Sequence, residues 1–266
     1  MGGHFHDEYF WNKFTFEVEQ MGFWKFGPLD LWIKRLSNEW RIWVEYSRDP
    51  LDIDFQHSLP FTDSIPSRDK IQMKRFGVKQ TDDEIHLTPT LSDRSIVIRP
   101  EVPLYILPKE EVELFASLPL WVRIETKDHV LIDEVPVYHL ANSWFGDPAG
   151  EGELCYSTTL SSKMKLKDLP ERFHRAITAI VIQNNSKESV LLERIKIPAP
   201  NLSLFKNEHN LFFTQRLTIE REKDGSFDLL YLDQSPHPEA GDAKDIYPAR
   251  ESLRENIITK TLSRFF

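Results

Sequence analysis

The stretch 29–46, LDLWIKRLSNEWRIWVEY, decides the fold class. Positions 29–36 begin by alternating apolar and polar residues, Ser37-Asn38 interrupts them, and the alternation resumes over positions 39–46. A period of two is typical of a half-buried strand, and a short polar break between two such runs is typical of a hairpin. The stretch therefore predicts a β-hairpin whose second strand carries four residues on one face: Trp40, Ile42, Val44 and Tyr46.

Similar short runs of β-branched and aromatic residues recur along the rest of the chain. In the middle they cover 95–99, 104–107, 112–115 and 120–124, and prolines at 100, 103, 108 and 119 close them. Later runs cover 130–132, 135–140, 153–159, 177–182, 190–197, 217–221 and 227–232. About a dozen strands exceed the 7 to 9 of one plain sandwich. We therefore predict an all-β, mainly antiparallel chain with two packed β-sandwich-like domains.

The predicted domains are 1–90, an N-terminal β-domain, and 91–248, a β-sandwich domain. The tail, 249–266, has apolar residues at helical spacing and predicts a C-terminal amphipathic helix. These residues are Leu253, Ile257, Ile258, Leu262, Phe265 and Phe266. Two interpretations stay open: the helix covers a sheet face of its own chain, or it is offered to a partner's groove or a membrane surface.

Composition excludes several classes of protein. Hydrophobic residues make up 40% of the 266 residues and aromatic residues 12%, far from the profile of a disordered chain. The formal net charge of −9 argues against a dedicated nucleic-acid-binding protein. One cysteine fits a reducing compartment, and no run approaches the roughly 18 apolar residues of a membrane span. We expect a cytoplasmic protein without a membrane span.

Common catalytic motifs are absent from the sequence. It holds no Gly-Lys-Ser/Thr phosphate loop, no Gly-x-Ser-x-Gly elbow and no His-Glu-x-x-His. Cys155 lies inside a predicted strand near acidic residues, where a buried structural thiol is the ordinary interpretation. We therefore predict no catalytic residue, no metal ligand and no cofactor. Metal-dependent hydrolysis would need a cluster of histidines and carboxylates that only the fold could assemble.

The densest local signal is the stretch 142–156, NSWFGDPAGEGELCY. As a binding loop, Trp144 and Phe145 would supply contact area, and Asp147 or Glu151 would supply polar specificity. As a structural feature, the two aromatic residues would plug one end of a sandwich and Gly146-Asp147-Pro148 would make the turn.

Several short stretches, taken in order, resemble the prokaryotic domain of unknown function 432 family. They are Phe26-Gly27-Pro28-Leu29 running into Glu39-Trp40, Pro119-Leu120-Trp121-Val122, Trp144-Phe145-Gly146-Asp147 with Gly152-Glu153-Leu154-Cys155-Tyr156, Ile182-Gln183-Asn184-Asn185-Ser186, and the basic tail around Arg250. The resemblance spans nearly the whole chain. It implies no established activity and no catalytic residues. Because genes of that family often lie beside those of small-conductance mechanosensitive channels, it also implies an accessory role for such a channel as a hypothesis.

The leading functional hypothesis is a non-enzymatic β-protein that binds another protein, with a mechanosensitive channel as one candidate partner. It would use exposed strand edges, the 144–153 loop, or the tail with Ile257, Leu262 and Phe265 as anchors. A homo-oligomer through edge pairing is a further option. The alternative is a carbohydrate-binding or carbohydrate-processing β-sandwich in which Trp32, Trp43, Trp121 and Trp144 stack on sugar rings.

Overall fold

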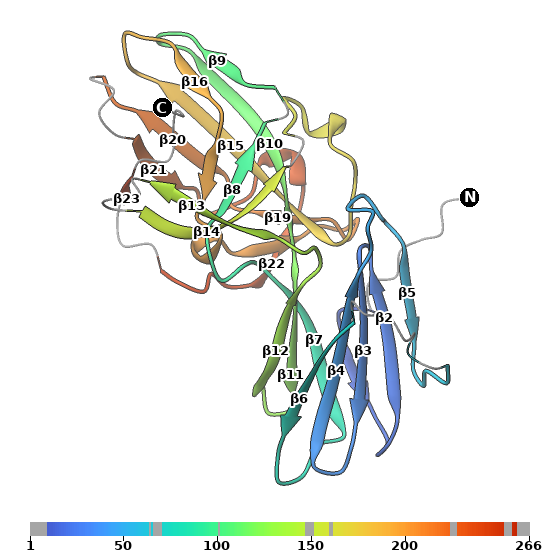
Figure 1. Ribbon diagram of the computed structural model, residues 1–266. Helices are drawn as coiled ribbons and strands as arrows, with labels where there is room; N and C mark the ends of the chain where they lie inside the picture. The colour runs from blue at the N-terminus through green and yellow to red at the C-terminus, as the bar shows by residue number, and fades with distance from the viewer. Residues whose placement is uncertain are drawn as a thin grey trace. The chain divides into compact units, whose positions relative to one another are not determined.

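The computed structural model describes residues 10–63, 65, 71–100, 102–146, 152–159, 162–223, 228–252 and 257–259. Within these residues the chain is all-β: its helical segments are three single turns of 3₁₀-helix, Leu166–Asp168, Ala199–Asn201 and Pro238–Ala240. The chain divides into two compact units (Figure 1), which we call unit 1 and unit 2. Unit 1 contains 1–90 and 120–139, and unit 2 contains 91–119 and 140–266.

Unit 1 contains a five-stranded antiparallel sheet in the order β5-β2-β3-β4-β6. Its strands are β2 Met21–Phe26, β3 Leu29–Arg35, β4 Glu39–Tyr46, β5 Phe55–Ser58 and β6 Gln72–Gly77. The predicted hairpin is confirmed as β3 and β4, which pair from Leu29 with Tyr46 to Arg35 with Trp40. Trp40, Ile42 and Val44 are buried on one face, as the alternation predicted.

The second sheet of unit 1 has four antiparallel strands in the order β1-β7-β11-β12. They are β1 Lys13–Thr15, β7 Glu84–Thr90, β11 Trp121–Thr126 and β12 Leu131–Pro136. Aromatic contacts join the two sheets: the Phe14 and Trp24 ring centroids are 5.0 Å apart, and those of Phe16 and Trp40 are 5.4 Å apart. Burying large rings is a main stabilising term for a domain of this size.

Unit 2 is built around β15, Arg175–Asn184, a strand buried along almost its whole length. On one side β15 pairs with β10, Glu111–Pro119; on the other it pairs in parallel with β19, Phe212–Thr214, and then with β20, Leu217–Arg221. The sheet continues through β18 Leu204–Lys206, β21 Asp228–Leu232, β22 Lys244–Tyr247 and β23 Ile257–Thr259. The parallel pairs make this eight-stranded sheet a mixed half-barrel and not a plain sandwich layer.

Two smaller sheets complete unit 2. One has the order β13-β14-β8-β17, with β8 Ile96–Arg99, β13 Ala141–Gly146, β14 Gly152–Thr159 and β17 Ile195–Ile197. The other pairs β9, Leu104–Ile106, with β16, Val190–Leu192. The four-stranded sheet carries β13 at one end, in yellow-green in Figure 1.

The predicted C-terminal helix is wrong where the structure describes the tail. Residues 249–252 are not helical, and Ile257–Thr259 form β23, which pairs antiparallel with β21. Ile257, Ile258 and Thr259 are β-branched and favour a strand once β21 offers an edge to pair with. Positions 253–256 and 260–266 lie outside the described residues.

The predicted ranges 1–90, 91–248 and 249–266 remain a prediction about domains. The compact units assign 120–139 to unit 1, because β11 pairs with β7. None of the helices in the described part of the chain is long and apolar enough to cross a membrane.

Candidate functional site

The candidate site is the hairpin of β13 and β14, whose described strands contain two of the candidate binding residues, Trp144 and Phe145. The two strands pair from Ala141 with Ser157 to Gly146 with Gly152. β14 then pairs in parallel with β8, and β8 pairs with β17. Because β13 ends this order, one side of its backbone has no strand neighbour among the described residues.

The register assigns side chains to the two faces of this sheet. Trp144 lies opposite Leu154, two residues along β14 from Tyr156, which lies opposite Ile96. These residues therefore share one face, since side chains alternate along a strand and paired residues point the same way. We call it the core face, because over β8 and β17 it carries four isoleucines that are fully or almost fully buried: Ile96, Ile98, Ile195 and Ile197.

The core face becomes exposed where it reaches the hairpin. Trp144 is 45% exposed and Leu154 is 47% exposed. We call this pair the overhang. Large apolar side chains that continue a buried face outward are typical of a surface that another molecule covers.

Gly152 determines how the Trp144 side chain lies. A Cβ placed on Gly152 would be 2.2 Å from Trp144 Nε1 and 2.4 Å from Trp144 Cε2, so the indole ring lies directly across the glycine backbone. Any larger residue at this position would displace the ring. The indole ring can lie in this position because residue 152 has no side chain.

The opposite face of the hairpin is closed. Phe145 and Cys155 are buried together with Val97 in a small apolar cluster. The Arg194 guanidinium lies 5.6 Å and the Lys196 ammonium 5.7 Å from the centre of the Phe145 ring, so both cations cover it. Phe145 is therefore a buried residue of this hairpin.

Cys155 is not suited to nucleophilic chemistry. Its side chain is fully buried, and burial, reinforced by the neighbouring Glu153 carboxylate, raises the pKa of the thiol to about 12. Glu153 Oε1 lies 3.4 Å from Cys155 Sγ, and Glu153 Oε2 lies 3.3 Å from Lys196 Nζ. Burial opposes ionisation of Glu153, but the Ser95 hydroxyl and Lys196 outweigh it and lower the pKa of that carboxyl. A protonated thiol beside a carboxylate is inert.

A polar group borders the core face beside the overhang. The Tyr156 hydroxyl donates a hydrogen bond to Asp93 Oδ1 at 3.0 Å, and the Arg94 guanidinium lies 5.3 Å from the centre of the Tyr156 ring. Burial, followed by the nearby Asp93, raises the pKa of Tyr156. An apolar pair rimmed by polar groups has the composition of a small protein-binding surface.

The other predicted site residues are not described at side-chain level. Asp147, Glu151, Leu262 and Phe265 lie outside the described residues, and of Ile257 only the backbone, in β23, is described.

Two of the four tryptophans proposed for sugar stacking are unavailable. Trp32 is 3% exposed and Trp121 is 4% exposed, whereas Trp43 is partly buried and Trp144 belongs to the overhang. The carbohydrate hypothesis depended on several exposed tryptophan rings. Two of the four proposed rings are buried and cannot stack on a sugar.

Sequence reasoning missed a second exposed apolar group, on β9 and its flanks. Val102, Tyr105 and Leu107 are all more than half exposed. In the sequence, Pro103 and Pro108 mark the ends of the run 104–107 but do not indicate its exposure. Prolines at both ends of an edge strand limit backbone pairing, so this group differs in kind from the β13 edge.

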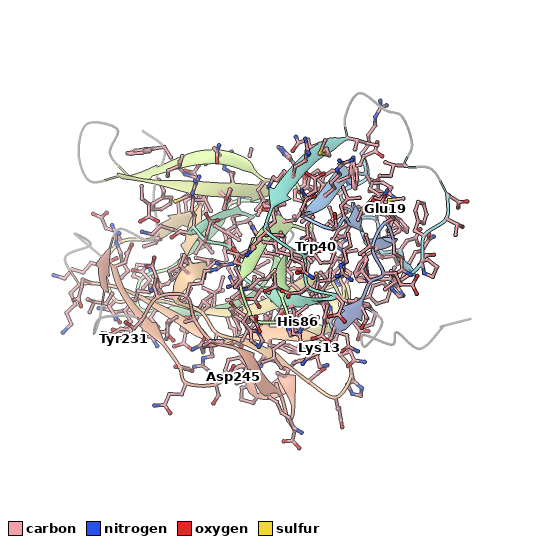
Figure 2. The ribbon with its side chains drawn as sticks, turned by 90° about the horizontal axis from the view of Figure 1, so that it is seen from below. Lys13, Glu19, Trp40, His86, Tyr231 and Asp245 are labelled. Atoms are coloured by element: carbon pink, nitrogen blue, oxygen red, sulfur yellow. The ribbon has the colours of Figure 1, made fainter. Side chains whose placement is uncertain are left out.

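A group of titratable side chains lies in unit 1, on β7 and its neighbours. His86 Nε2 lies 2.8 Å from Glu84 Oε1, and the His86 and His129 rings are 5.1 Å apart. Lys13 and Glu125 lie opposite His86 in the two flanking strands, and Figure 2 labels Lys13 and His86 side by side. The hydrogen bond from His86 lowers the pKa of Glu84. Backbone pairing joins β7 to β1 and β11, so the group lies within one sheet and we assign it a structural role.

Across the described residues, no group of three or more His, Cys, Asp or Glu side chains could hold a metal ion.

Two stretches that carried the family resemblance have structural roles. The buried Asn184 side-chain amide donates to the carbonyl oxygens of Ile106 and Leu107, both at 3.0 Å, and of Glu188 at 2.8 Å, while Asn184 Oδ1 accepts from Ser186. The Arg250 guanidinium donates to the Leu91 carbonyl oxygen at 2.7 and 3.0 Å. Both residues therefore link segments of unit 2 that are distant in the sequence: Asn184 contacts 106–107 and Arg250 contacts Leu91.

Comparison with known proteins gives one match. A family model described as protein of unknown function (DUF432) matches residues 10–266, which confirms the resemblance drawn from the sequence. No curated protein and no solved structure matches the chain.

Proposed function

The chain belongs to the DUF432 family, and from that premise we propose that it is a non-enzymatic protein-binding factor, with an accessory or regulatory role, that binds its partner through the overhang. The observation that carries the proposal is the exposed pair Trp144 and Leu154 at the outer end of an otherwise buried core face. The proposal includes a cytoplasmic location. One candidate partner is the cytosolic part of a small-conductance mechanosensitive channel.

The size of the overhang suits a specific contact. A fully covered tryptophan side chain buries about 150–250 Å², so covering the 45% of Trp144 that is exposed removes about 90 Å² of mostly apolar surface from water. At about 25 cal/mol per Å² this stabilises a complex by about 2 kcal/mol. That contribution corresponds to roughly a thirtyfold change in affinity.

The test is affinity purification of the tagged chain from its native host in mild detergent, followed by mass spectrometry. We expect the intact chain to recover a specific protein and a Trp144→Ala, Leu154→Thr double variant to lose it. The matched control is Tyr105→Ala with Leu107→Thr, which removes two exposed side chains from β9 and the residue that follows it. The control is expected to recover the partner as the intact chain does.

Loss of the partner with the β9 variant and retention with the overhang variant would move the binding surface to β9 and contradict the proposal. Recovery of no specific protein by any of the chains would count against protein binding altogether. Isothermal titration against a glycan panel would then test the carbohydrate alternative, with Trp144 as its exposed ring.

A further inference from the structure

We propose that the loop between β4 and β5 is a second protein-binding surface, on which Leu51 and Ile53 enter an apolar groove that a partner protein lines with lysine or arginine. We call residues 47–54, SRDPLDID, the aspartate loop. It lies in unit 1 and shares no residue with the overhang, so the inference is independent of the function proposed above.

The first argument is the exposure of two aliphatic side chains in this loop. Leu51 is 59% exposed and Ile53 is 62% exposed, the highest values for any leucine and any isoleucine in the described part of the chain. A single exposed apolar residue is ordinary on a protein surface. Here the two extremes stand two positions apart, in a loop whose other residues are Ser, Arg, Asp and Pro. Loops carried by a sheet are a common place for binding residues, so this pair is a candidate anchor.

The second argument is that the aspartate loop is attached to the sheet beside it. Asp52, the residue between the two aliphatic side chains, places its Oδ2 atom 2.8 Å from Lys25 Nζ of β2, and both side chains are mostly buried. The Gly27 amide, just after β2, donates a hydrogen bond to the Asp54 carbonyl oxygen at 2.8 Å. The middle and the end of the loop therefore both contact the region of β2.

The third argument is charge, and it selects the partner. Asp49 and Asp54 lie on either side of the aliphatic pair, and both are exposed. Neither forms an ion pair with another described residue; the Asp49 carboxylate accepts a hydrogen bond only from an uncharged donor, the Leu51 amide, at 2.8 Å. Against three aspartates the loop has one basic residue, Arg48. A groove lined by lysine or arginine would attract these carboxylates.

The same charge argues against two other occupants. A second copy of this chain would bring its own net charge of −9 to the contact. An anionic membrane surface, which could accept exposed leucine and isoleucine side chains, would repel the aspartates. A basic, apolar protein surface is the occupant that suits both the aliphatic pair and the carboxylates.

The first step of the test is photocrosslinking with the full chain in its native host. The photoreactive residue p-benzoylphenylalanine replaces Ile53, and mass spectrometry identifies the crosslinked protein and the peptide that contacts this position. The matched control carries the same residue in place of Val130, which is 60% exposed and also lies in unit 1. We expect a product at position 53 that the control lacks, with lysine or arginine among the apolar residues of the contacting peptide.

The second step is isothermal titration of that protein, once purified, with the full chain. Leu51→Ser with Ile53→Ser should weaken binding by about tenfold or more. Asp49→Asn with Asp54→Asn keeps the shape of the loop and the acceptor oxygen for the Leu51 amide. It should weaken binding by about threefold or more at low salt and make binding less sensitive to salt. Val130→Ser should change neither, and circular dichroism checks that every variant is folded.

The proposal would be overturned if position 53 gave no specific product, or the same products as position 130. A contacting peptide without lysine or arginine would overturn it as well. So would unchanged low-salt binding by the asparagine variant, because the carboxylates would then have no part in choosing the partner. None of these results bears on the overhang, whose own variant tests the proposed function.

Discussion

Two hairpins of this protein, β3–β4 and β13–β14, each carry aromatic residues and have opposite surroundings. β3 and β4 lie inside a five-stranded sheet, with β2 on one side and β6 on the other, and Trp40 of β4 is almost fully buried. β13 and β14 lie at the end of a four-stranded sheet, and Trp144 of β13 is 45% exposed. The comparison teaches that an aromatic residue on a strand acquires its role from the neighbours of the strand, and not from the hairpin itself.

The largest expected difference between the hairpins is in stability. Trp40→Ala should destabilise the protein by about 3–5 kcal/mol, because it leaves a large cavity between the sheets of unit 1. Trp144→Ala should cost less than about 1 kcal/mol, since its ring already contacts water. Denaturant unfolding followed by circular dichroism measures both. Equal losses in the free energy of unfolding for the two variants would contradict this comparison, because Trp144 would then behave as a core residue.

The second prediction concerns the closed face of the edge hairpin. Because burial raises the pKa of the Cys155 thiol to about 12, the native chain should react with iodoacetamide at pH 8 at least a hundredfold more slowly than the unfolded chain. Intact-mass analysis follows the reaction, with chain in denaturant as the control. Fast labelling of the native protein would show that the hairpin is open on both faces.

A third prediction uses a matched pair of glycines, one in each sheet. Gly152→Ala should displace the Trp144 ring and weaken partner binding by about tenfold, while costing the fold less than about 1 kcal/mol. Gly77→Ala, in β6 beside the central hairpin, is the control, because a Cβ there meets no atom within 4 Å. Titration of the partner recovered from the host measures both variants. Unchanged binding by Gly152→Ala would mean that the orientation of Trp144 does not matter.

The smallest expected effect is a pH dependence confined to unit 1. The His57 ring packs against Phe14 and Trp24, with centroids 5.2 and 5.3 Å away, and burial lowers its pKa below the ordinary value of 6.5. The unfolded chain therefore binds a proton more readily than the folded one, so stability should decrease as pH falls below about 6.5.

Thermal unfolding of the intact chain and of His57→Gln between pH 7.5 and 5.5 checks this prediction. The variant should lose less stability on acidification than the intact chain. The segment 141–159 contains no histidine, so partner binding at the edge hairpin should not share this dependence. A larger acid sensitivity in the variant would contradict the assigned environment of His57.

Local patterns in the sequence predicted the strands well and their neighbours poorly. The alternation in 29–46 predicted β3 and β4, whereas 144–153 was interpreted as a loop and its first residues, Trp144 to Gly146, belong to strand β13. Neither pattern contains the order of strands in a sheet, which depends on pairing between distant segments. For that reason the burial of Trp32 and Trp121 and the exposure of Trp144 could not be told apart.

The tail illustrates the same limit. The spacing of Ile257 and its apolar neighbours fits a helix, but β-branched residues also fit a strand, and pairing with β21 decides between them over Ile257–Thr259. The prolines around β9 were noticed as ends of a strand, whereas the exposure of Tyr105 between them follows from the two-stranded sheet in which β9 lies.

The most direct test of the central claim is hydrogen exchange measured by mass spectrometry on the full chain, alone and with the partner recovered from its host. If the edge hairpin binds the partner, amides in Ala141–Gly146 should exchange at least about tenfold more slowly in the complex, while those of β3 and β4 should not change. Unchanged exchange in β13, together with new protection around β9 or elsewhere, would contradict the account.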